Sequence, residues 1–537
     1  MQIKFLNKSI INNEMKQKKF WSWIGSFPFF PLFLTIYSIL FFLNLNITQV
    51  DYHAADRLLT ILPAITLFLL IIMSVVLRDI RRAGFVVFVF GLIFFTYPHV
   101  RMVIQGKIPV LANDNILLPL SIILLACGIL FATKLSREKM ATLSLYLNAI
   151  TLILALIQLS LILVYEYKMD ARWRNADLQI PASSNIVPPR NGTLPDVYFI
   201  VLDGYARADV LQSALNLDNS PFLDALRKRQ FYVADCSMSN YAQTEQSLAS
   251  TLEMKYLDGI ISKINVDHLE EKFFVPYIRD NTVRRYLESV GYQTVSFFTG
   301  YSWAEWPDAT YYLGDPRASA KNASSLIPFE GQFLSRTLFP FMMTGLEGIG
   351  IVKAPQINEL TGRGVDRGIV RYELDELPVV THLRGPKFVY AHILLPHPPY
   401  VFGPNGEEQD LSTDNSNLAL LHQGYRDQVL YANKRILPII DTILAESKGN
   451  AIIVLEGDHG IVDYTTGTEH MKNLSAYYFP DHNYSDLYPQ ITPVNSFRVI
   501  LSNYFGQNYP SLGDQSYFAA TSAQKTFTLI PNPCPGH

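Results

Sequence analysis

The sequence has little cysteine and little charge. Only three of its 537 residues are cysteine, which excludes a small disulfide-rich scaffold. Charged residues make up 17% of the chain and the formal net charge is -3, whereas a soluble domain carries about a quarter charged residues. No block of basic residues gives the electrostatic pattern of a nucleic-acid-binding protein. We therefore expect no nucleic-acid partner.

The shortage of charge is concentrated in the first part of the chain, up to about Tyr165. Five apolar segments lie there, and four meet or approach the roughly twenty residues that a helix needs to cross a bilayer. The third is short before Pro98 and spans only if its helix continues to Ile104; otherwise it is a re-entrant or interfacial helix. We expect a five-helix transmembrane domain over residues 1–166, built on Ile24–Ile47, Leu58–Leu77, Ala83–Tyr97, Ile116–Thr133 and Ser144–Tyr165.

The cations that flank these segments predict their orientation, since short loops rich in lysine and arginine stay in the cytoplasm. Cations are frequent in the N-terminal tail and in the second and fourth loops, and scarcer in the first and third. This pattern predicts a cytoplasmic N-terminus, and an odd number of spans places everything after Tyr165 outside. We expect a multi-pass protein of the cytoplasmic membrane. The cations are Lys4, Lys8, Lys16, Lys18, Lys19, Arg78, Arg81, Arg82, Lys134, Arg137 and Lys139.

The rest of the chain has the pattern of an α/β domain. After a proline-containing linker at residues 167–195, short apolar runs that suit buried parallel strands alternate with helical patterns. We expect a mostly parallel central sheet within an extracytoplasmic domain at residues 196–505, followed by a C-terminal tail at 506–537. The strand-like runs begin at Asp196, Gly291, Lys387 and Ala451. Whether Cys236 and Cys534 form a disulfide is left open by the sequence.

Two carboxylates and an imidazole follow strand-like runs, at the places where open α/β sheets bind ligands. Asp203 follows the first run, and Asp458 and His459 follow the last, all next to glycine. Carboxylate and imidazole groups are ligands of divalent metals of the zinc or manganese kind. Taken singly, such a residue is more often the cap of a helix or turn. Their occurrence at two strand ends of one sheet favours a metal site.

Thr244 is the candidate nucleophile, because its segment has the pattern of a loop that leads into a helix. A helix N-terminus favours an incoming anion, and a metal-bound threonine hydroxyl is activated by its lowered pKa. Alternatively, Thr244 and Ser247 are ordinary N-cap hydroxyls. Arg207 is either a phosphate clamp or a solvated surface arginine.

Four motifs in this order resemble the sulfatase-like branch of the alkaline phosphatase superfamily. They are Val-Leu-Asp203-Gly-Tyr, Asn-Tyr-x-x-Thr244-x-x-Ser-Leu-Ala-Ser, Leu-Pro-His397-Pro-Pro-Tyr and Gly-Asp458-His459-Gly. The match runs from about Asp196 to Phe505. With its five-span anchor, the whole chain is similar to lipoteichoic acid synthases and, more distantly, to phosphoethanolamine transferases.

The resemblance implies roles for individual residues. One divalent metal, zinc or manganese, would be bound, with a second metal left open. His397 matches a histidine that contacts the substrate phosphate or protonates the leaving group, and His470 matches a further histidine of the transferases, although a surface histidine fits that spacing equally well. The implied metal ligands are Asp203, Thr244, Asp458 and His459.

Two segments limit the resemblance. The segment Phe298–Asp308 resembles a substrate-contacting loop of the phosphoglycerol transferases, which places Trp306 beside the substrate. Asp308 stands where that loop carries an arginine, so the likeness does not extend to the transferred group. True sulfatases need a Cys-x-Pro-x-Arg-like motif, whereas the sequence Cys236-Ser-Met-Ser-Asn lacks both the proline and the arginine.

We therefore expect a membrane-anchored, metal-dependent phosphotransferase or phosphodiesterase that acts through Thr244 outside the cytoplasmic membrane. Its substrate would be a phosphate group linked to a membrane lipid or an envelope glycan. Two alternatives are a sulfuric ester hydrolase or phosphatase of the same fold, and a non-catalytic envelope scaffold or sensor. The sequence assigns neither the acceptor nor an oligomeric state.

Overall fold

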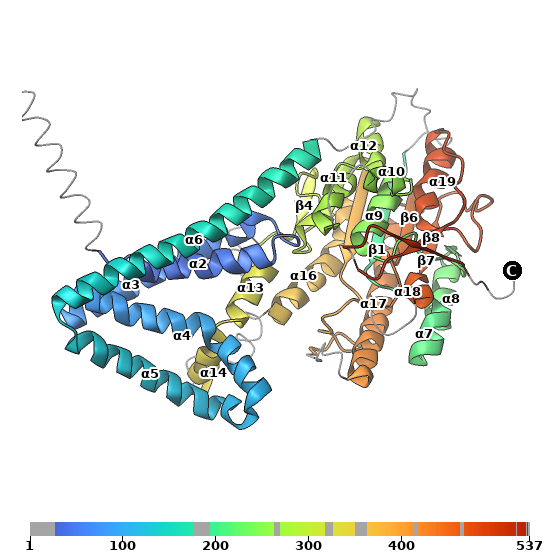
Figure 1. Ribbon diagram of the computed structural model, residues 1–537. Helices are drawn as coiled ribbons and strands as arrows, with labels where there is room; N and C mark the ends of the chain where they lie inside the picture. The colour runs from blue at the N-terminus through green and yellow to red at the C-terminus, as the bar shows by residue number, and fades with distance from the viewer. Residues whose placement is uncertain are drawn as a thin grey trace, which may run out of the picture. The chain divides into compact units, whose positions relative to one another are not determined.

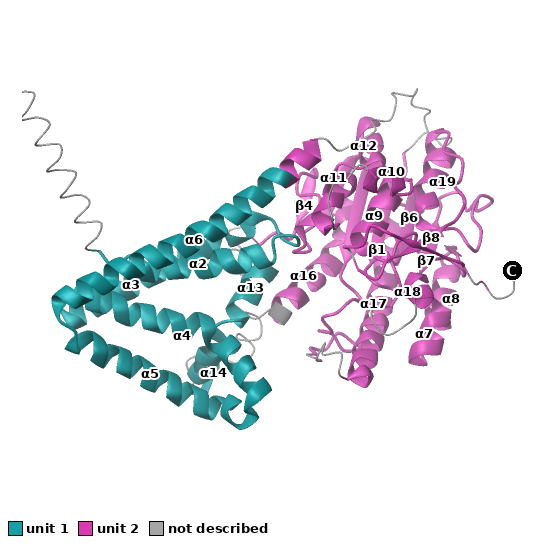
Figure 2. Cartoon of the chain, in the orientation of Figure 1, with its two compact units in different colours: residues 1–168, 327–362 teal, residues 169–326, 363–537 magenta. Residues whose placement is uncertain are grey.

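The chain separates into two compact units (Figure 2). The helical unit comprises Met1–Lys168 and Ile327–Gly362, and the α/β unit comprises Met169–Leu326 and Arg363–His537. The sequence predicted two successive parts, whereas the segment 327–362 belongs to the helical unit although it lies between two stretches of the α/β unit. The computed structural model describes residues 27–174, 194–262, 269–316, 326–348, 362–409, 411, 417–461, 467–521, 523–532 and 534.

Five apolar helices follow one another in the helical unit (Figure 1). Four of the described helices, α3 to α6, are long and apolar enough to cross a membrane. Helix α2 has 16 residues, about 24 Å, so the structure gives four candidate spans where the sequence predicted five. The first predicted span begins among residues 1–26, outside the described residues, as do the tail lysines. The bounds are Phe30–Leu45 (α2), Asp56–Leu77 (α3), Ile80–Lys107 (α4), Asp114–Lys134 (α5) and Arg137–Arg174 (α6), with short 3-10 turns at Tyr52–Ala55 (η1) and Pro109–Ala112 (η2).

Helix α4 continues through Pro98 and ends at Lys107, so the third predicted span takes its longer form. Proline has no backbone N–H, and the carbonyl four residues earlier, that of Phe94, therefore lacks its helical donor. The N–H of Leu338 donates to this carbonyl at 2.8 Å. Replacement donors of this kind allow a membrane helix to contain proline.

A seven-stranded sheet forms the centre of the α/β unit, in the order β2-β7-β6-β1-β5-β3-β4. Strands β6, β1, β5, β3 and β4 are parallel neighbours, and β7 is antiparallel to both β6 and β2. The central strands are buried on both faces, which explains their continuous apolar runs. The bounds are Asp196–Leu202 (β1), Tyr232–Val233 (β2), Gln293–Phe297 (β3), Tyr311–Leu313 (β4), Lys387–Ile393 (β5), Ala451–Glu456 (β6) and Ser475–Tyr478 (β7).

Helices cover both faces of the sheet. Successive side chains of a strand point to opposite faces; Ile200 joins the core formed with α7, α8, α16 and α17, whereas the ring of Phe199 packs edge-on at 5.2 Å from Phe497 of α19. Helix α9 contacts α11, α12 and α19. The bounds are Ala208–Leu215 (α7), Ser220–Lys228 (α8), Thr244–Glu253 (α9), Asp258–Ile261 (α10), Glu271–Phe274 (η3), Val275–Arg279 (α11), Thr282–Ser289 (α12), Ser302–Ala304 (η4), Gly362–Glu376 (α16), Val379–His382 (η5), Leu418–Glu446 (α17), Gly467–Met471 (α18) and Pro493–Phe505 (α19).

The C-terminal residues, which the sequence set apart as a tail, belong to the α/β unit. Strands Ser516–Phe518 (β8) and Thr528–Ile530 (β9) form an antiparallel pair. Cys534 forms a disulfide with Cys236, with 5.6 Å between the Cα atoms. The two cysteines are 298 positions apart, so only the folded chain brings them together.

We expect the purified chain to show one reactive thiol before reduction, because two of its three cysteines are bonded and Cys127 is free. Alkylation followed by mass spectrometry counts the labelled cysteines. Cys236→Ser should lower the free energy of unfolding of the α/β unit by about 2–4 kcal/mol. Cys127→Ser is the matched control and should leave the unfolding midpoint of this unit unchanged. Labelling of all three cysteines without a reductant would contradict the bond.

Candidate metal centre

Neighbouring parallel strands bring the predicted carboxylates to one edge of the sheet. Val201 of β1 is in register with Glu456 of β6, so Asp203 and Asp458, each two residues further on, follow the same edge. Both aspartates are buried. The structure thus places Asp203 and Asp458 where the strand-end pattern predicted them.

A sharp turn after β1 links the two carboxylates. Gly204 has a φ of +70°, a conformation that favours glycine, and its N–H donates to Asp458 Oδ1 at 2.8 Å. A Cβ atom at Gly204 would lie 3.4 Å from the His459 ring. The hydroxyl of Tyr425 donates to the Gly204 carbonyl at 2.6 Å and accepts from the N–H of Ala206 at 3.0 Å. The side chains of Asp458 and Tyr425 therefore hold the backbone of the turn, and the Asp203 side chain is not used to hold it.

Three donor atoms surround His459 Nε2. It lies 3.2 Å from Thr244 Oγ1, 3.7 Å from Asp203 Oδ1 and 3.6 Å from Asp458 Oδ2. In a tetrahedral site with bonds of about 2.0–2.1 Å, two ligand atoms lie about 3.3 Å apart. The distances from His459 to these three atoms are close to that spacing, so each of Thr244, Asp203 and Asp458 lies near His459 at a separation that a shared ion would need.

The protonation of these donors also suits a cation. His459 Nδ1 is 2.8 Å from the Gly460 carbonyl and must donate to it, so Nε2 of the neutral ring offers a lone pair. Asp203 Oδ1 and Asp458 Oδ2 are buried with no hydrogen-bond partner among the described residues. Buried carboxylate oxygens need a compensating charge. The donor set therefore fits a divalent metal ion.

Helix α9 presents Thr244 to this cluster. Thr244 is the first residue of the helix and is half-buried, so its hydroxyl lies where the helix dipole favours negative charge. Ser247, one turn later, donates its hydroxyl to the Asp458 carbonyl at 2.6 Å. The hydroxyls of Ser247 and Thr244 thus have separate partners. Ser247 bonds the loop after β6, and Thr244 contacts His459.

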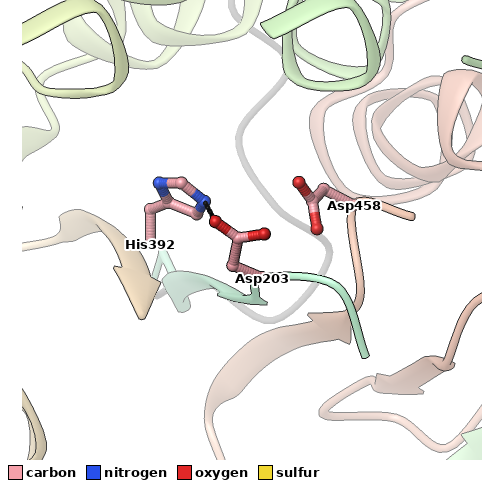
Figure 3. A group of neighbouring side chains, drawn as sticks. All are labelled: Asp203, His392 and Asp458. Atoms are coloured by element: carbon pink, nitrogen blue, oxygen red, sulfur yellow. Dashed lines mark ion pairs between the residues drawn. The ribbon is translucent and has the colours of Figure 1, made fainter. Parts of the chain in front are cut away.

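His392 completes a second donor group that sequence reasoning missed. It lies in β5, and its Nε2 is 3.4 Å from Asp203 Oδ2 (Figure 3). One donor atom each from Asp203, His392 and Asp458 lies within 4.8 Å of the others. Both ring nitrogens of His392 are buried with no hydrogen-bond partner in the described structure. The available signal was a single polar residue inside the apolar run of β5.

Opposite charges shift the pKa values of these groups. Burial acts to raise the pKa of Asp203, but the neighbouring imidazoles of His397, His392 and His459 outweigh it, and the pKa is lowered. Burial acts to lower the pKa of His459, but the carboxylates of Asp458 and Asp203 outweigh it, and that pKa is raised. Asp203 is therefore ionised at neutral pH and available to bind a cation.

His397 lies at the rim of the cluster. Its ring is 6.4 Å from that of His459, measured between centroids, and its backbone N–H donates to the Asp203 carbonyl at 3.1 Å. Nδ1 is 2.7 Å from the Pro398 carbonyl and donates to it, so Nε2 is the ring nitrogen that can take part in other contacts. Gln428 donates to the carbonyls of Pro396 and His397 and so holds this loop.

His470 packs against His459. Its ring stacks on that of His459 at 4.9 Å, and Nε2 donates to the Ala242 carbonyl at 2.6 Å. Burial, together with the neighbouring His459, lowers the pKa of His470 to about 4. His470 therefore stacks on His459 and bonds the backbone just before Thr244.

The structure does not bring Arg207 or Trp306 to the cluster. Arg207 is buried and bonds Asp209 through two nitrogens, at 2.8 and 2.9 Å. Trp306 is fully buried, stacks on Tyr390 at 4.6 Å and donates to a backbone carbonyl. Arg207 is thus engaged by a carboxylate, and Trp306 has no exposed surface. Asp308, beside Trp306, pairs with Arg284.

The sulfatase family model matches residues 195–524, more than half of the chain, so the chain belongs to the sulfatase family. This confirms the predicted sulfatase-like class of enzyme. No curated protein matches the chain.

Solved structures of low identity also match. The zinc complex of the C-terminal periplasmic domain of EptC from Escherichia coli is 14% identical, with a TM-score of 0.39 over 66% of this chain and 96% of that one. Lipooligosaccharide phosphoethanolamine transferase A from Neisseria meningitidis is 14% identical, with a TM-score of 0.41 over 89% and 96%. The lipoteichoic acid synthase LtaP from Listeria monocytogenes is 13% identical, with a TM-score of 0.36 over 65% and 82%.

We expect the purified chain to bind a divalent cation, zinc or manganese, in a calorimetric titration. Asp203→Asn and Asp458→Asn should each lower the affinity more than about a hundredfold, because losing a direct ligand costs more than the ten- to hundredfold loss of an outer partner. Asp235→Asn, at an exposed aspartate paired with Arg227, is the control.

His392→Ala separates the two donor groups. If Asp203, Thr244, Asp458 and His459 hold the ion, His392→Ala should weaken binding by only about ten- to a hundredfold. A loss as large as that of Asp458→Asn, with little effect of His459→Ala, would assign the ion to Asp203, His392 and Asp458 instead.

Proposed function

We propose that this sulfatase-family protein is a membrane-anchored phosphotransferase or phosphodiesterase with Thr244 as its nucleophile. Its substrates are phosphate groups linked to membrane lipids or envelope glycans. The observation that carries the proposal is the 3.2 Å approach of Thr244 Oγ1 to His459 Nε2, beside two buried carboxylate oxygens without hydrogen-bond partners. The likeness of the whole chain, with its apolar anchor, to lipoteichoic acid synthases supports phosphorus as the atom attacked.

A divalent cation held by Asp203, Thr244, Asp458 and His459 would lower the pKa of the Thr244 hydroxyl and offset the charge of the phosphate. Thr244 Oγ, having given its hydroxyl proton to solvent, forms a bond to phosphorus while the bond from phosphorus to the leaving oxygen breaks. His397 donates a proton from Nε2 to that oxygen. A second alcohol, or water, gives its proton to His397 and attacks the phosphothreonine, which restores Thr244 and transfers or releases the phosphate group.

The sulfatase alternative is weakened by Cys236. Sulfatases with a formylglycine nucleophile make it from cysteine or serine, and the sulfur of Cys236 is committed to the disulfide with Cys534. The scaffold alternative is weakened by the donor atoms around His459, which a protein without a metal would have no reason to keep buried. Thr244 therefore remains the best-placed nucleophile of the α/β unit.

Three observations support a fifth span and an external α/β unit. Helix α2 runs in the same direction as α4, since Phe30 pairs with Phe88 and, further along, Leu34 meets Gly91. This direction is the one that a span before α3 requires. The disulfide in the α/β unit suits an oxidising compartment. Segment 327–348, which is joined by the chain to the α/β unit, contacts the ends of α2 and α3 nearest the first loop, which the cation pattern places outside.

We expect the C-terminus to lie outside the cytoplasmic membrane, because five spans follow a cytoplasmic N-terminus. A reporter enzyme that matures only outside, fused after His537, should be active, and a reporter that works only in the cytoplasm should be silent. The same pair fused after Leu135, in the cation-rich fourth loop, is the control and should give the opposite result. Reversed activities at both sites would refute the proposed orientation.

Replacing Thr244 tests the nucleophile. Thr244→Ala should lower turnover of a chromogenic phosphodiester by about four to six orders of magnitude, as expected for loss of a nucleophile, while the three remaining ligands keep the metal. His397→Ala should cost less, about a hundred- to ten-thousandfold, the usual contribution of an acid or base. Thr251→Ala, in the same helix, is the control.

The covalent intermediate gives an independent readout. After brief mixing with substrate and acid quench, mass spectrometry should find a phosphate on Thr244 of the native chain and none on the Thr244→Ala variant. Metal content is measured in the same samples, so that a lost ion is not mistaken for a lost nucleophile. Full turnover by Thr244→Ala would mean that water attacks phosphorus directly, and the proposed mechanism would be wrong.

A further inference from the structure

Residues 327–348 lie in the stretch Ile327–Gly362 of the helical unit, although the chain before Ile327 and after Gly362 belongs to the α/β unit. They form two short helices, Pro328–Ser335 (α13) and Phe339–Gly348 (α14). Nothing in the predicted chemistry uses this segment. Its contacts with the membrane helices therefore need an explanation of their own.

The first contact is a backbone hydrogen bond that Pro98 makes available. Pro98 cannot donate to the carbonyl of Phe94, and the N–H of Leu338, between α13 and α14, donates to that carbonyl at 2.8 Å. An ordinary residue at position 98 would occupy the carbonyl from within α4. The proline therefore creates an acceptor on α4 that a backbone N–H from elsewhere in the chain can use.

The second contact is an ion pair with a buried carboxylate. The guanidinium of Arg57, at the start of α3, bonds both carboxylate oxygens of Glu330, with Nε to Oε1 at 2.8 Å. Glu330 is 1% exposed, and its Oε2 also accepts from the N–H of Ile327 at 3.0 Å, which caps α13. A carboxylate buried this deeply depends on its cationic partner.

Aromatic rings fill the space between these polar contacts. Phe329 and Phe333 of α13 pack on Phe42 of α2, with centroids 5.1 and 5.5 Å apart, and Phe333 also lies 6.1 Å from Phe95 of α4. Such pairs contribute beyond the area that they bury. The segment thus meets three membrane helices through apolar, ionic and backbone contacts.

We propose that residues 327–348 are a docking element that attaches the α/β unit to the membrane helices a second time, independently of α6. Its partner is the surface formed by Phe42, Arg57 and Phe94, and Pro98 is the residue that gives this surface its backbone acceptor. The chain then joins the α/β unit to the docked element at both of its ends. The proposal does not depend on the reaction at Thr244.

Cutting the first attachment tests for the second. A site for a specific protease is placed between residues 182 and 183 of the full chain, and membranes are treated with that protease. The fragment that begins at residue 183 should remain in the membrane pellet. A fragment that appears in the supernatant as fast as it is cut would overturn the proposal.

Variants of the element should release the fragment. Leu338→Pro, which removes the donated N–H, should speed release about three- to tenfold, the usual effect of one interhelical hydrogen bond. Leu338→Ala controls for the lost side chain. Glu330→Ala should speed release at least about tenfold, because Arg57 loses its partner. Retention that none of these variants changes would mean attachment to lipid and would overturn docking on α4.

The proline gives a sharper test. In the Pro98→Ala variant, the N–H of residue 98 can donate to the Phe94 carbonyl within α4. Adding Leu338→Pro to this variant should change the logarithm of the release rate by less than half as much as it does in the native chain. Pro63→Ala, at a proline in α3, is the control and should leave the effect of Leu338→Pro intact. An effect of Leu338→Pro that is equal in both backgrounds would overturn the role of Pro98.

A crosslink keeps the proposal testable if a variant fails to fold. With Cys127 replaced by Ser, Phe95→Cys and Phe333→Cys in one chain should be joined by a short thiol crosslinker, so that the two cleaved fragments migrate together. Val76→Cys, at an exposed position in the last turn of α3, replaces Phe95→Cys in the control and should give no such product. Equal yields from the two pairs would overturn the docking.

Discussion

Asp203 and Asp458 are buried at the ends of neighbouring strands, and each keeps one carboxylate oxygen without a hydrogen-bond partner in the described structure. Burying an unpaired carboxylate costs several kcal/mol, so the surrounding residues must supply positive charge. His459 and His392 supply part of it, and a divalent ion can supply the rest. Glu456, two residues before Asp458, is also buried, but it is protonated and not ionised. Burial, with the charge of Asp458, raises the pKa of Glu456 to about 8, so it is neutral at pH 7.

The loops that carry Asp203, Asp458 and His397 are held by side chains that bond their main-chain groups. Tyr425 bonds the turn after β1, Ser247 bonds the carbonyl of Asp458, and Gln428 bonds the loop of His397. His470 steadies the chain just before Thr244 in the same way. Because neutral side chains and main-chain groups position these loops, the carboxylate oxygens of Asp203 and Asp458 stay available to bind a cation. This separation of roles keeps a metal-sized arrangement in place, as catalysis by oriented groups requires.

Buried polar groups need hydrogen-bond partners in the helical unit as well, because little water is available there to bond them. Asn148 of α6 accepts from the N–H of Phe30 and donates to the carbonyl of Phe27, so it satisfies the start of α2. Leu338 serves the carbonyl that Pro98 leaves free. Thr35 and Thr66 pair across α2 and α3 at 2.9 Å. Each of these bonds joins segments that are distant in sequence, and together they define which helices are neighbours.

Local patterns in the sequence were enough for the division into an apolar and a globular part and for the parallel strands. They were also enough to place Asp203 and Asp458 at strand ends and Thr244 at the start of a helix. These features depend on hydrophobic periodicity and on residues adjacent in the chain, as for Asp458 and His459. Other features arise only when distant segments meet. The sequence could not show that Cys236 reaches Cys534, that His392 faces Asp203, or that Trp306 and Arg207 are committed to partners in the α/β unit. Nor could it assign segment 327–348 to the helical unit, because its anchoring bond depends on a carbonyl more than two hundred residues earlier, left open by Pro98.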